Sequence, residues 1–258
     1  MKAATVFKKL GWKHEIWQWV RYYNSVLKRD KEKELFLKTG NINGFTISPD
    51  NLKLLNSYIQ YRERLLPEIY ELLRTEEEAK LFCERLGVEV GTTTTRSRDH
   101  HQSSKAMVAA AGYLAVAVAS RYGLTAEINP QKPAVWCERE RLIVTARNLD
   151  GAIPSLENPR VVWEIKEYWG KTQGGSKMSD AIYECMLVGM ELRISEEEFG
   201  ARKVWHALLL DGREQWGCRI SDLRRAIDIL HQGLIDVLIV GKEVETEWAP
   251  FLESVLAT

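Results

Sequence analysis

The sequence lacks several features that would set it apart from ordinary intracellular proteins. Its four cysteines, Cys83, Cys137, Cys185 and Cys218, lie far apart and form no CxxC pair, which argues against a zinc site made of closely spaced thiols. The first residues contain no apolar stretch typical of a secretory signal. The most apolar run, residues 106–120, is rich in alanine and too short to span a bilayer comfortably. We therefore expect a soluble cytoplasmic protein with reduced thiols.

A net charge is also missing. The 36 Lys and Arg residues balance 36 Asp and Glu residues, so the formal net charge is zero. This balance gives no support for nonspecific binding to polyanions, although a local basic groove can lie beside an acidic face. With 258 residues, 45% of them hydrophobic, the chain is long enough to bury a full core in one large domain or two small ones.

The first ninety residues have the periodicity of helices. Apolar residues recur at helical spacing from Trp12 to Tyr23. Ser48 precedes Pro-Asp and predicts the start of another helix, and Thr75 with Glu78 predicts a capping box for a third. We expect residues 1–90 to form a helical region that contributes DNA contacts or a dimer surface.

The remainder, residues 91–258, alternates between helical and β-rich segments. The expected order is a buried helix, three strands, a helix, a strand, a helix, a strand and a final helix, at about 103–122, 134–137, 142–145, 161–169, 177–192, 203–210, 221–230, 236–240 and 246–256. This order predicts an α/β protein of the α+β type, in which helices flank a central mixed sheet.

One apolar strand carries two charged residues on the same face. Side chains alternate along a strand, so Glu164 and Lys166 point to one side of residues 161–166, and Trp163 and Ile165 point to the other. Charges inside so apolar a strand cost free energy unless they have partners. A divalent metal ion is a suitable partner for Glu164, and a phosphate or a water molecule is one for Lys166.

A second carboxylate precedes this strand. Asp150 lies at the end of the preceding β-rich run, and a short loop between two strands would bring it beside Glu164. Two carboxylates with water molecules form a hard oxygen site that suits Mg²⁺. The acid-x-Lys triplet alone is weak evidence, because Glu78-Ala-Lys80 has the same form in a polar helical run, where it indicates a solvated surface.

The pattern Asp150 … Glu164-Ile-Lys166 resembles the PD-(D/E)xK phosphodiesterase superfamily, which includes many restriction endonucleases. The order of helix, three strands, helix and strand across about 100–212 is similar to that family's core. Leu149 stands where the family often has proline before the first acid.

The resemblance implies a metal site and a reaction. Asp150 and Glu164 would hold Mg²⁺ together with the backbone carbonyl of Ile165. Lys166 would orient or deprotonate the attacking water and stabilise charge on the phosphate. The implied reaction is metal-assisted hydrolysis of a phosphodiester.

Two polar segments are candidates for DNA contacts. The segment 91–104 carries Arg96 and Arg98 among short hydroxyl side chains and could clamp a DNA backbone, or it could be a disordered polar loop. Its adjacent residues His100 and His101 offer a further alternative, a transition-metal site. A glycine-rich loop that opens a helix supplies the second set, which could contact phosphates or base edges or could be a mobile surface loop: Lys171, Thr172, Gln173, Ser176 and Lys177.

These patterns favour a type II restriction endonuclease that cleaves double-stranded DNA at a short specific site with Mg²⁺. Cleavage of both strands of a palindrome favours a homodimer, because the symmetry of the protein then matches that of the site. Two alternatives are a structure-specific or repair nuclease and a nucleic-acid-binding or scaffold module without catalysis. The intact set of Asp150, Glu164 and Lys166 argues against the last of these.

Overall fold

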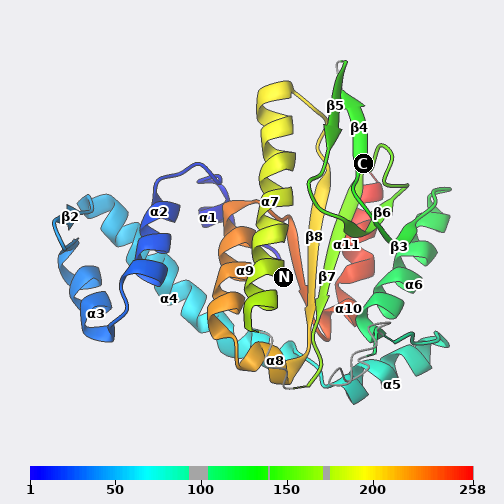
Figure 1. The fold of residues 1–258 in the computed structure, drawn as a ribbon, viewed down its shortest axis with the longest axis horizontal. Helices are drawn as coiled ribbons and strands as arrows, with labels where there is room; N and C mark the ends of the chain where they lie inside the picture. The colour runs from blue at the N-terminus through cyan, green and yellow to red at the C-terminus, as the bar shows by residue number, and fades with distance from the viewer. Residues whose placement is uncertain (93–103, 139, 171–174, 258) are drawn as a thin grey trace.

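A five-stranded mixed sheet with helices on both faces forms the centre of the protein (Figure 1). The computed structural model describes residues 1–92, 104–138, 140–170 and 175–257, with the side chains of 175–177 excepted. The sheet order is β3-β6-β7-β8-β9. Strands β3, β6 and β7 pair antiparallel, whereas β7, β8 and β9 pair parallel. The strands span Glu127–Lys132, Leu149–Ile153, Val161–Glu167, Trp205–Asp211 and Val237–Val240. The mixed α/β class expected from the sequence is confirmed.

Two of the three strands expected between residues 134 and 166 do form, but the expectation that they belong to the central sheet is wrong. The stretches 134–137 and 142–145 form β4 (Val135–Glu138) and β5 (Arg141–Val144), a hairpin separate from the central sheet. The sheet instead contains β3 and β6. Strand β3 is a largely exposed edge strand with Pro130 inside it. Strand β6 has Asp-Gly directly after its first residue, Leu149. Neither strand therefore has the alternation of apolar and polar residues that identifies a strand in a sequence.

The other expected segments lie within a few residues of their predicted bounds, except that the helix expected to end at 192 extends to Phe199. The expected final helix divides in two, and the helix expected from Ser221 begins one residue earlier without a side-chain cap. The observed helices are α6 (Ala106–Arg121), α7 (Gly175–Phe199), α8 (Arg213–Gly217), α9 (Ile220–Gln232), α10 (Glu243–Thr246) and α11 (Trp248–Leu256).

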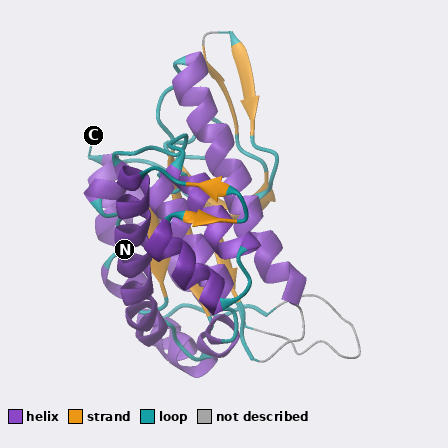
Figure 2. Ribbon diagram, turned by 90° about the vertical axis from the view of Figure 1, so that its left-hand side faces the viewer, coloured by secondary structure: helices purple, strands orange, loops and turns teal. Residues whose placement is uncertain are grey.

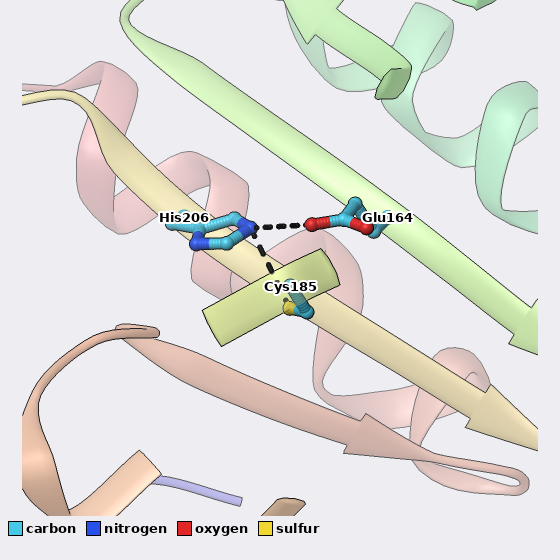
Figure 3. Close-up of side chains that lie close together, drawn as sticks. All are labelled: Glu164, Cys185 and His206. Atoms are coloured by element: carbon cyan, nitrogen blue, oxygen red, sulfur yellow. Dashed lines mark hydrogen bonds and ion pairs between the residues drawn. The ribbon is translucent and has the colours of Figure 1, made fainter. Parts of the chain in front are cut away.

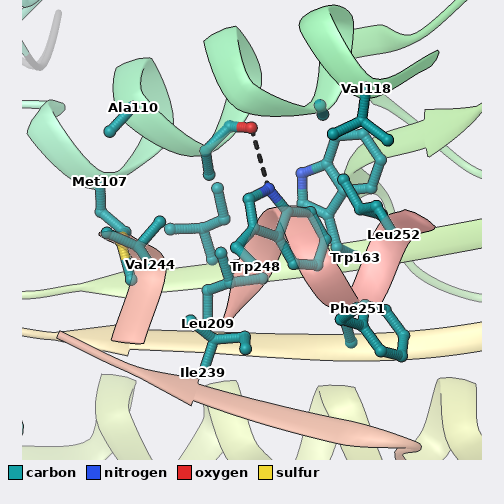
Figure 4. Packing of buried hydrophobic residues seen from close by; sticks show 14 of the residues in the cluster. Met107, Ala110, Val118, Trp163, Leu209, Ile239, Val244, Trp248, Phe251 and Leu252 are labelled. Atoms are coloured by element: carbon teal, nitrogen blue, oxygen red, sulfur yellow. Dashed lines mark hydrogen bonds between the residues drawn. The ribbon is translucent and has the colours of Figure 1, made fainter. Parts of the chain in front are cut away.

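One face of the sheet is covered by α6 and α11. Trp163 of β7 packs edge-on against Trp248 of α11, with ring centroids 5.6 Å apart (Figure 4). The Trp248 indole N–H donates a hydrogen bond of 3.0 Å to the carbonyl of Ala111 in α6. The many alanines of α6 let its backbone approach these rings closely, so this face packs as an apolar core.

Gly151 is required by this packing. Gly151 lies opposite Trp163 in the register of β6 and β7. A Cβ atom at position 151 would lie 1.9 Å from Cζ2 of Trp163, which is far inside van der Waals contact. The indole therefore crosses directly over the glycine, and only a residue without a side chain fits in this part of β6.

The opposite face is covered by α7 and α9. Leu208 and Leu210 of β8 pack there with Ile182 of α7 and Ile227 of α9. Because side chains alternate along β7, this is also the face toward which Glu164 and Lys166 point. Any site built on those two residues therefore lies between the sheet and α7.

The N-terminal part is mainly helical, as expected (Figure 2). It has its own apolar cluster. Ser48 accepts a hydrogen bond from the amide of Asn51, and the capping box of Thr75 and Glu78 is present, so both predicted helix starts are confirmed. The helix expected from Trp12 begins only at Ile16. The elements are α1 (Thr5–Lys8), α2 (Ile16–Arg21), the π-helical turn η1 (Tyr22–Val26), α3 (Asp30–Thr39), β1 (Asn41–Ile42), β2 (Phe45–Thr46), α4 (Pro49–Leu72) and α5 (Glu76–Leu86).

The N-terminal helices contact the sheet domain through α4 and α5. The end of α4 places Ile69 among the apolar side chains of α8 and α9. Ala79 and Phe82 of α5 pack into the cluster formed by α6 and α11. Within the described part of the chain, no helix is long and apolar enough to cross a membrane.

Candidate functional site

Asp150 and Glu164 lie across from each other on adjacent antiparallel strands. The register pairs Ala152 with Val162 and Gly151 with Trp163, and one further step places Asp150 opposite Glu164. Residues opposite each other in such a pair point to the same face. Asp150 is the second residue of β6 rather than the end of a preceding strand, but it reaches the neighbourhood expected from the sequence.

The Asp150 carboxylate is held by two hydrogen bonds. Its Oδ2 atom accepts a bond of 2.7 Å from the backbone amide of Ile165, and its Oδ1 atom accepts one of 2.6 Å from Nε2 of Gln131. Burial raises the pKa of Asp150 above its ordinary value. The Ile165 amide and the charge of Lys166 lower it only in part.

The Glu164 carboxylate is almost completely buried, with 1% of its surface exposed. Its Oε1 atom lies 3.2 Å from Nε2 of His206. Its Oε2 atom lies 3.1 Å from Nζ of Lys166 as an ion pair, without the angles of a hydrogen bond. Burial favours the neutral acid, but His206 and Lys166 outweigh it, so the pKa of Glu164 lies below its ordinary value.

Lys166 lies among carboxylates. Besides Glu164, its Nζ atom lies 3.7 Å from Oε2 of Glu184 on α7, and Glu184 is paired with Arg147. Burial disfavours the charged amine, but Glu164 and then Asp150 outweigh burial and raise the pKa of Lys166 well above its ordinary value. The side chain is therefore an ammonium, which attracts anions such as phosphate.

Two residues at this site were not identified from the sequence. His206 on β8 and Cys185 on α7 are both fully buried, and Cys185 Sγ lies 3.7 Å from His206 Nε2 (Figure 3). The register of β7 and β8 pairs His206 with Val162, which places it on the face of Glu164. The available signal was a single histidine inside an otherwise apolar strand, and the cysteine gave no signal of its own.

Glu164, Cys185 and His206 form a group that could hold a metal ion. Their candidate ligand atoms, one each of oxygen, sulfur and nitrogen, lie within 4.8 Å of one another. Burial and the negative charge of Glu164 raise the pKa of the Cys185 thiol well above its ordinary value in the absence of a metal. Asp150 is not part of this group.

The proposed DNA contacts fall where the structure gives no information. Arg96, Arg98, Lys171, Thr172 and Gln173 lie outside the described residues, as do His100 and His101. Ser176 and Lys177 belong to the first turn of α7, but their side chains are not described. These residues therefore stay predictions from the sequence.

A pocket of about 370 Å³ lies elsewhere, between α2, η1, α7 and α9. Its walls include Trp17, Arg21, Tyr183 and Arg225. None of Asp150, Glu164, Lys166 or His206 lines it. The pocket is therefore separate from the carboxylate site, which lies between α7 and the sheet.

The fold and the buried polar group define a mixed α/β protein with charged side chains gathered on one face of its sheet. The family model for a domain of unknown function, DUF7687, matches residues 74–255, and the chain belongs to that family. No curated protein and no solved structure matches the chain. The match begins at Arg74, two residues after the end of α4, and spans the whole five-stranded sheet together with Asp150, Glu164 and His206.

Proposed function

We propose that the protein is a Mg²⁺-dependent nuclease with a restriction-endonuclease-like core, and specifically a type II restriction endonuclease that cleaves double-stranded DNA at a short specific site. The observation that carries the proposal is the placement of Asp150, Glu164 and Lys166 on one face of two adjacent strands. The order of the elements of the central sheet, α6, β3, β6, β7, α7 and β8, supports it, because it has the helix, three strands, helix and strand that the PD-(D/E)xK resemblance implies, with the separate hairpin of β4 and β5 inserted between β3 and β6.

The donor atoms fit a hard divalent cation. Glu164 Oε2 is buried and has no hydrogen-bond partner of good geometry among the described residues, so it has a lone pair available. Asp150 and Glu164 would hold Mg²⁺, with the backbone carbonyl of Ile165 as a further ligand. When bound, the ion polarises the phosphate and lowers the pKa of a coordinated water molecule.

The residues of the chain supply orientation and charge. The ammonium group of Lys166 would attract the scissile phosphate, orient the attacking water and stabilise charge that develops in the transition state. The hydrogen bond from Ile165 fixes the Asp150 carboxylate before DNA binds, which reduces the reorganisation needed for reaction. Arg96, Arg98 and the segment 171–177 would contact the DNA.

A digest of mixed DNA tests the proposal. The full chain would be stripped with EDTA and incubated with plasmid and linear duplex DNA, with MgCl₂ or with EDTA. Discrete fragments that appear only with Mg²⁺ are the expected result, and a dimer in sedimentation analysis would accompany them. A smear, or cutting confined to ends and junctions, would replace the restriction enzyme with a repair or structure-specific nuclease. No cleavage of any DNA would leave a binding module and overturn the proposed activity.

A further inference from the structure

The group formed by Glu164, Cys185 and His206 brings three kinds of metal ligand to one buried point. The residues come from three elements, β7, α7 and β8, and are 1%, 0% and 0% exposed. In Figure 3 the side chains of Glu164 and Cys185 converge on Nε2 of His206. We propose that these three residues bind a zinc ion, or a divalent transition metal of similar preference. Glu164 is shared with the proposed Mg²⁺ site, where its other carboxylate oxygen, Oε2, would act. The zinc proposal does not require nuclease activity, because it rests only on this donor set and its burial.

The hydrogen bonding of His206 leaves an acceptor facing an acceptor. The Nδ1 atom lies 3.2 Å from the carbonyl oxygen of Leu234, which can only accept, so Nδ1 carries the proton of the neutral ring. Nε2 then directs a lone pair at Glu164 Oε1, 3.2 Å away. Two acceptors at this distance need a cation between them. That cation is either a second ring proton, the state in which His206 lowers the pKa of Glu164, or a metal ion. A backbone carbonyl that fixes Nδ1–H is the usual outer partner of a metal-bound histidine.

Two of the three separations between the donor atoms match a tetrahedral zinc site, and the third, between Glu164 and Cys185, is within 4.8 Å. Ordinary zinc bonds of about 2.0–2.1 Å to nitrogen, 2.0–2.2 Å to oxygen and 2.3 Å to sulfur imply separations of about 3.3 Å for N···O and about 3.6 Å for N···S. The observed separations from His206 Nε2 are 3.2 Å to Glu164 and 3.7 Å to Cys185. Mg²⁺ prefers six oxygen ligands, and thiolate selects softer ions, so this donor set favours zinc over magnesium.

The charge balance also favours a cation with a thiolate. The carboxylates of Asp150 and Glu164 outnumber the ammonium group of Lys166 by one when His206 is neutral and Cys185 is a thiol, and the more exposed pair of Glu184 and Arg147 is neutral by itself. A Zn²⁺ ion with a Cys185 thiolate adds one positive charge and makes the set neutral. Because an uncompensated buried charge is costly, this neutrality would stabilise the folded protein.

Metal analysis and cobalt substitution test the site without DNA. The full chain, purified without chelator, is expected to contain about one zinc per molecule by elemental analysis. After removal of the metal, a Co²⁺ titration is expected to give the thiolate charge-transfer band and the visible bands of tetrahedral cobalt. Cys185→Ser should abolish the charge-transfer band, and His206→Gln should weaken Co²⁺ affinity by about tenfold or more. Excess Mg²⁺ should not displace the cobalt.

Cys83→Ser is the matched control, because Cys83 is also buried but donates its hydrogen bond to the carbonyl of Ala106. Its cobalt spectrum should be that of the wild type. Substoichiometric zinc together with a wild-type cobalt spectrum lacking a thiolate band would overturn the proposal. The cation between His206 Nε2 and Glu164 would then be a second ring proton rather than a metal ion. The wild-type spectrum decides the question even if a variant fails to fold. Loss of DNA cleavage with zinc still bound would contradict only the proposed nuclease.

Discussion

The backbone amide of Ile165 donates a hydrogen bond to the Asp150 carboxylate, with N and Oδ2 2.7 Å apart. This bond joins β6 to β7 beyond Gly151 and Trp163, the last pair of their register. Ile165 lies between Glu164 and Lys166 in β7. Its amide therefore fixes the Asp150 carboxylate next to the two residues that carry the other carboxylate and the ammonium group. The geometry of this group therefore depends on the local pairing of two strands rather than on a flexible loop.

Replacing the proposed catalytic residues should remove cleavage without unfolding the protein. Asp150→Ala and Lys166→Ala are each expected to lower Mg²⁺-dependent DNA cleavage by about 10²-fold or more, because each loses a metal ligand or the positive charge near the phosphate. A plasmid cleavage assay measures the effect, and circular dichroism checks the fold. Lys80→Ala is the matched control, since Lys80 belongs to the other acid-x-Lys triplet and its side chain is 45% exposed. Full activity in either site variant would reject the assignment.

Gly151→Ala should destabilise the protein. The added Cβ would lie 1.9 Å from the Trp163 ring, which is held in turn by Trp248. We expect a loss of about 1–3 kcal/mol in the free energy of unfolding, the range found for overpacked cores. Urea denaturation measures it. Gly91→Ala is the control, because a Cβ there meets no atom within 4 Å. Equal stability of the two variants would show that the indole can move away.

The buried ion pair of Arg74 and Asp211 should matter far more than a surface pair. Arg74 Nη2 lies 2.7 Å from Asp211 Oδ2, and the two side chains are 1% and 0% exposed. Arg74→Ala leaves a buried carboxylate without its partner and should cost about 3–5 kcal/mol of stability.

The surface pair of Arg121 and Glu253 provides the comparison. These side chains are 59% and 39% exposed, although the pair is only 2.6 Å apart. Arg121→Ala should change stability by about 1 kcal/mol or less, because water screens an exposed pair. Chemical denaturation of both variants side by side would test the contrast. A small effect of Arg74→Ala would mean that Asp211 is neutral or solvated in the folded protein.

Glu167 should make stability depend on pH. Burial raises the pKa of Glu167 to about 8 from an ordinary value of 4.5, although the amide of Met107 opposes the shift. As the pH rises between these values, the unfolded chain releases the proton while the folded protein keeps it, so this carboxyl destabilises the fold progressively. The loss is complete above about pH 8.

Glu167→Gln removes this titration. The stability of the wild type relative to the variant should therefore fall from pH 5 to pH 8 and then level off. Urea denaturation at a series of pH values, in the presence of EDTA, measures the difference. The exposed residue Glu89 provides the control variant Glu89→Gln. A difference that stays constant, or rises with pH, would contradict the raised pKa of Glu167.

The parts of the fold that were predicted correctly depend on local interactions. Ser48 and Thr75 cap their helices through hydrogen bonds to residues three positions away, so the sequence contains both partners within one turn. The alternation that puts Glu164 and Lys166 on one face is likewise a property of a single strand. The edge strand β3 was missed because Asn129 and Gln131 have positive φ angles and its side chains do not alternate in polarity.

The sequence by itself determined that Glu164 and Lys166 share a face, because alternation along a strand needs no other part of the chain. Only the tertiary structure decided what surrounds them. Cys185 lies 21 residues after Glu164 and His206 lies 42 residues after it, and neither residue forms a sequence motif with Glu164. The parallel pairing of β7 with β8 and the packing of α7 on the sheet bring the three together. Such contacts between distant segments depend on the packing of whole elements, which no short stretch of sequence specifies.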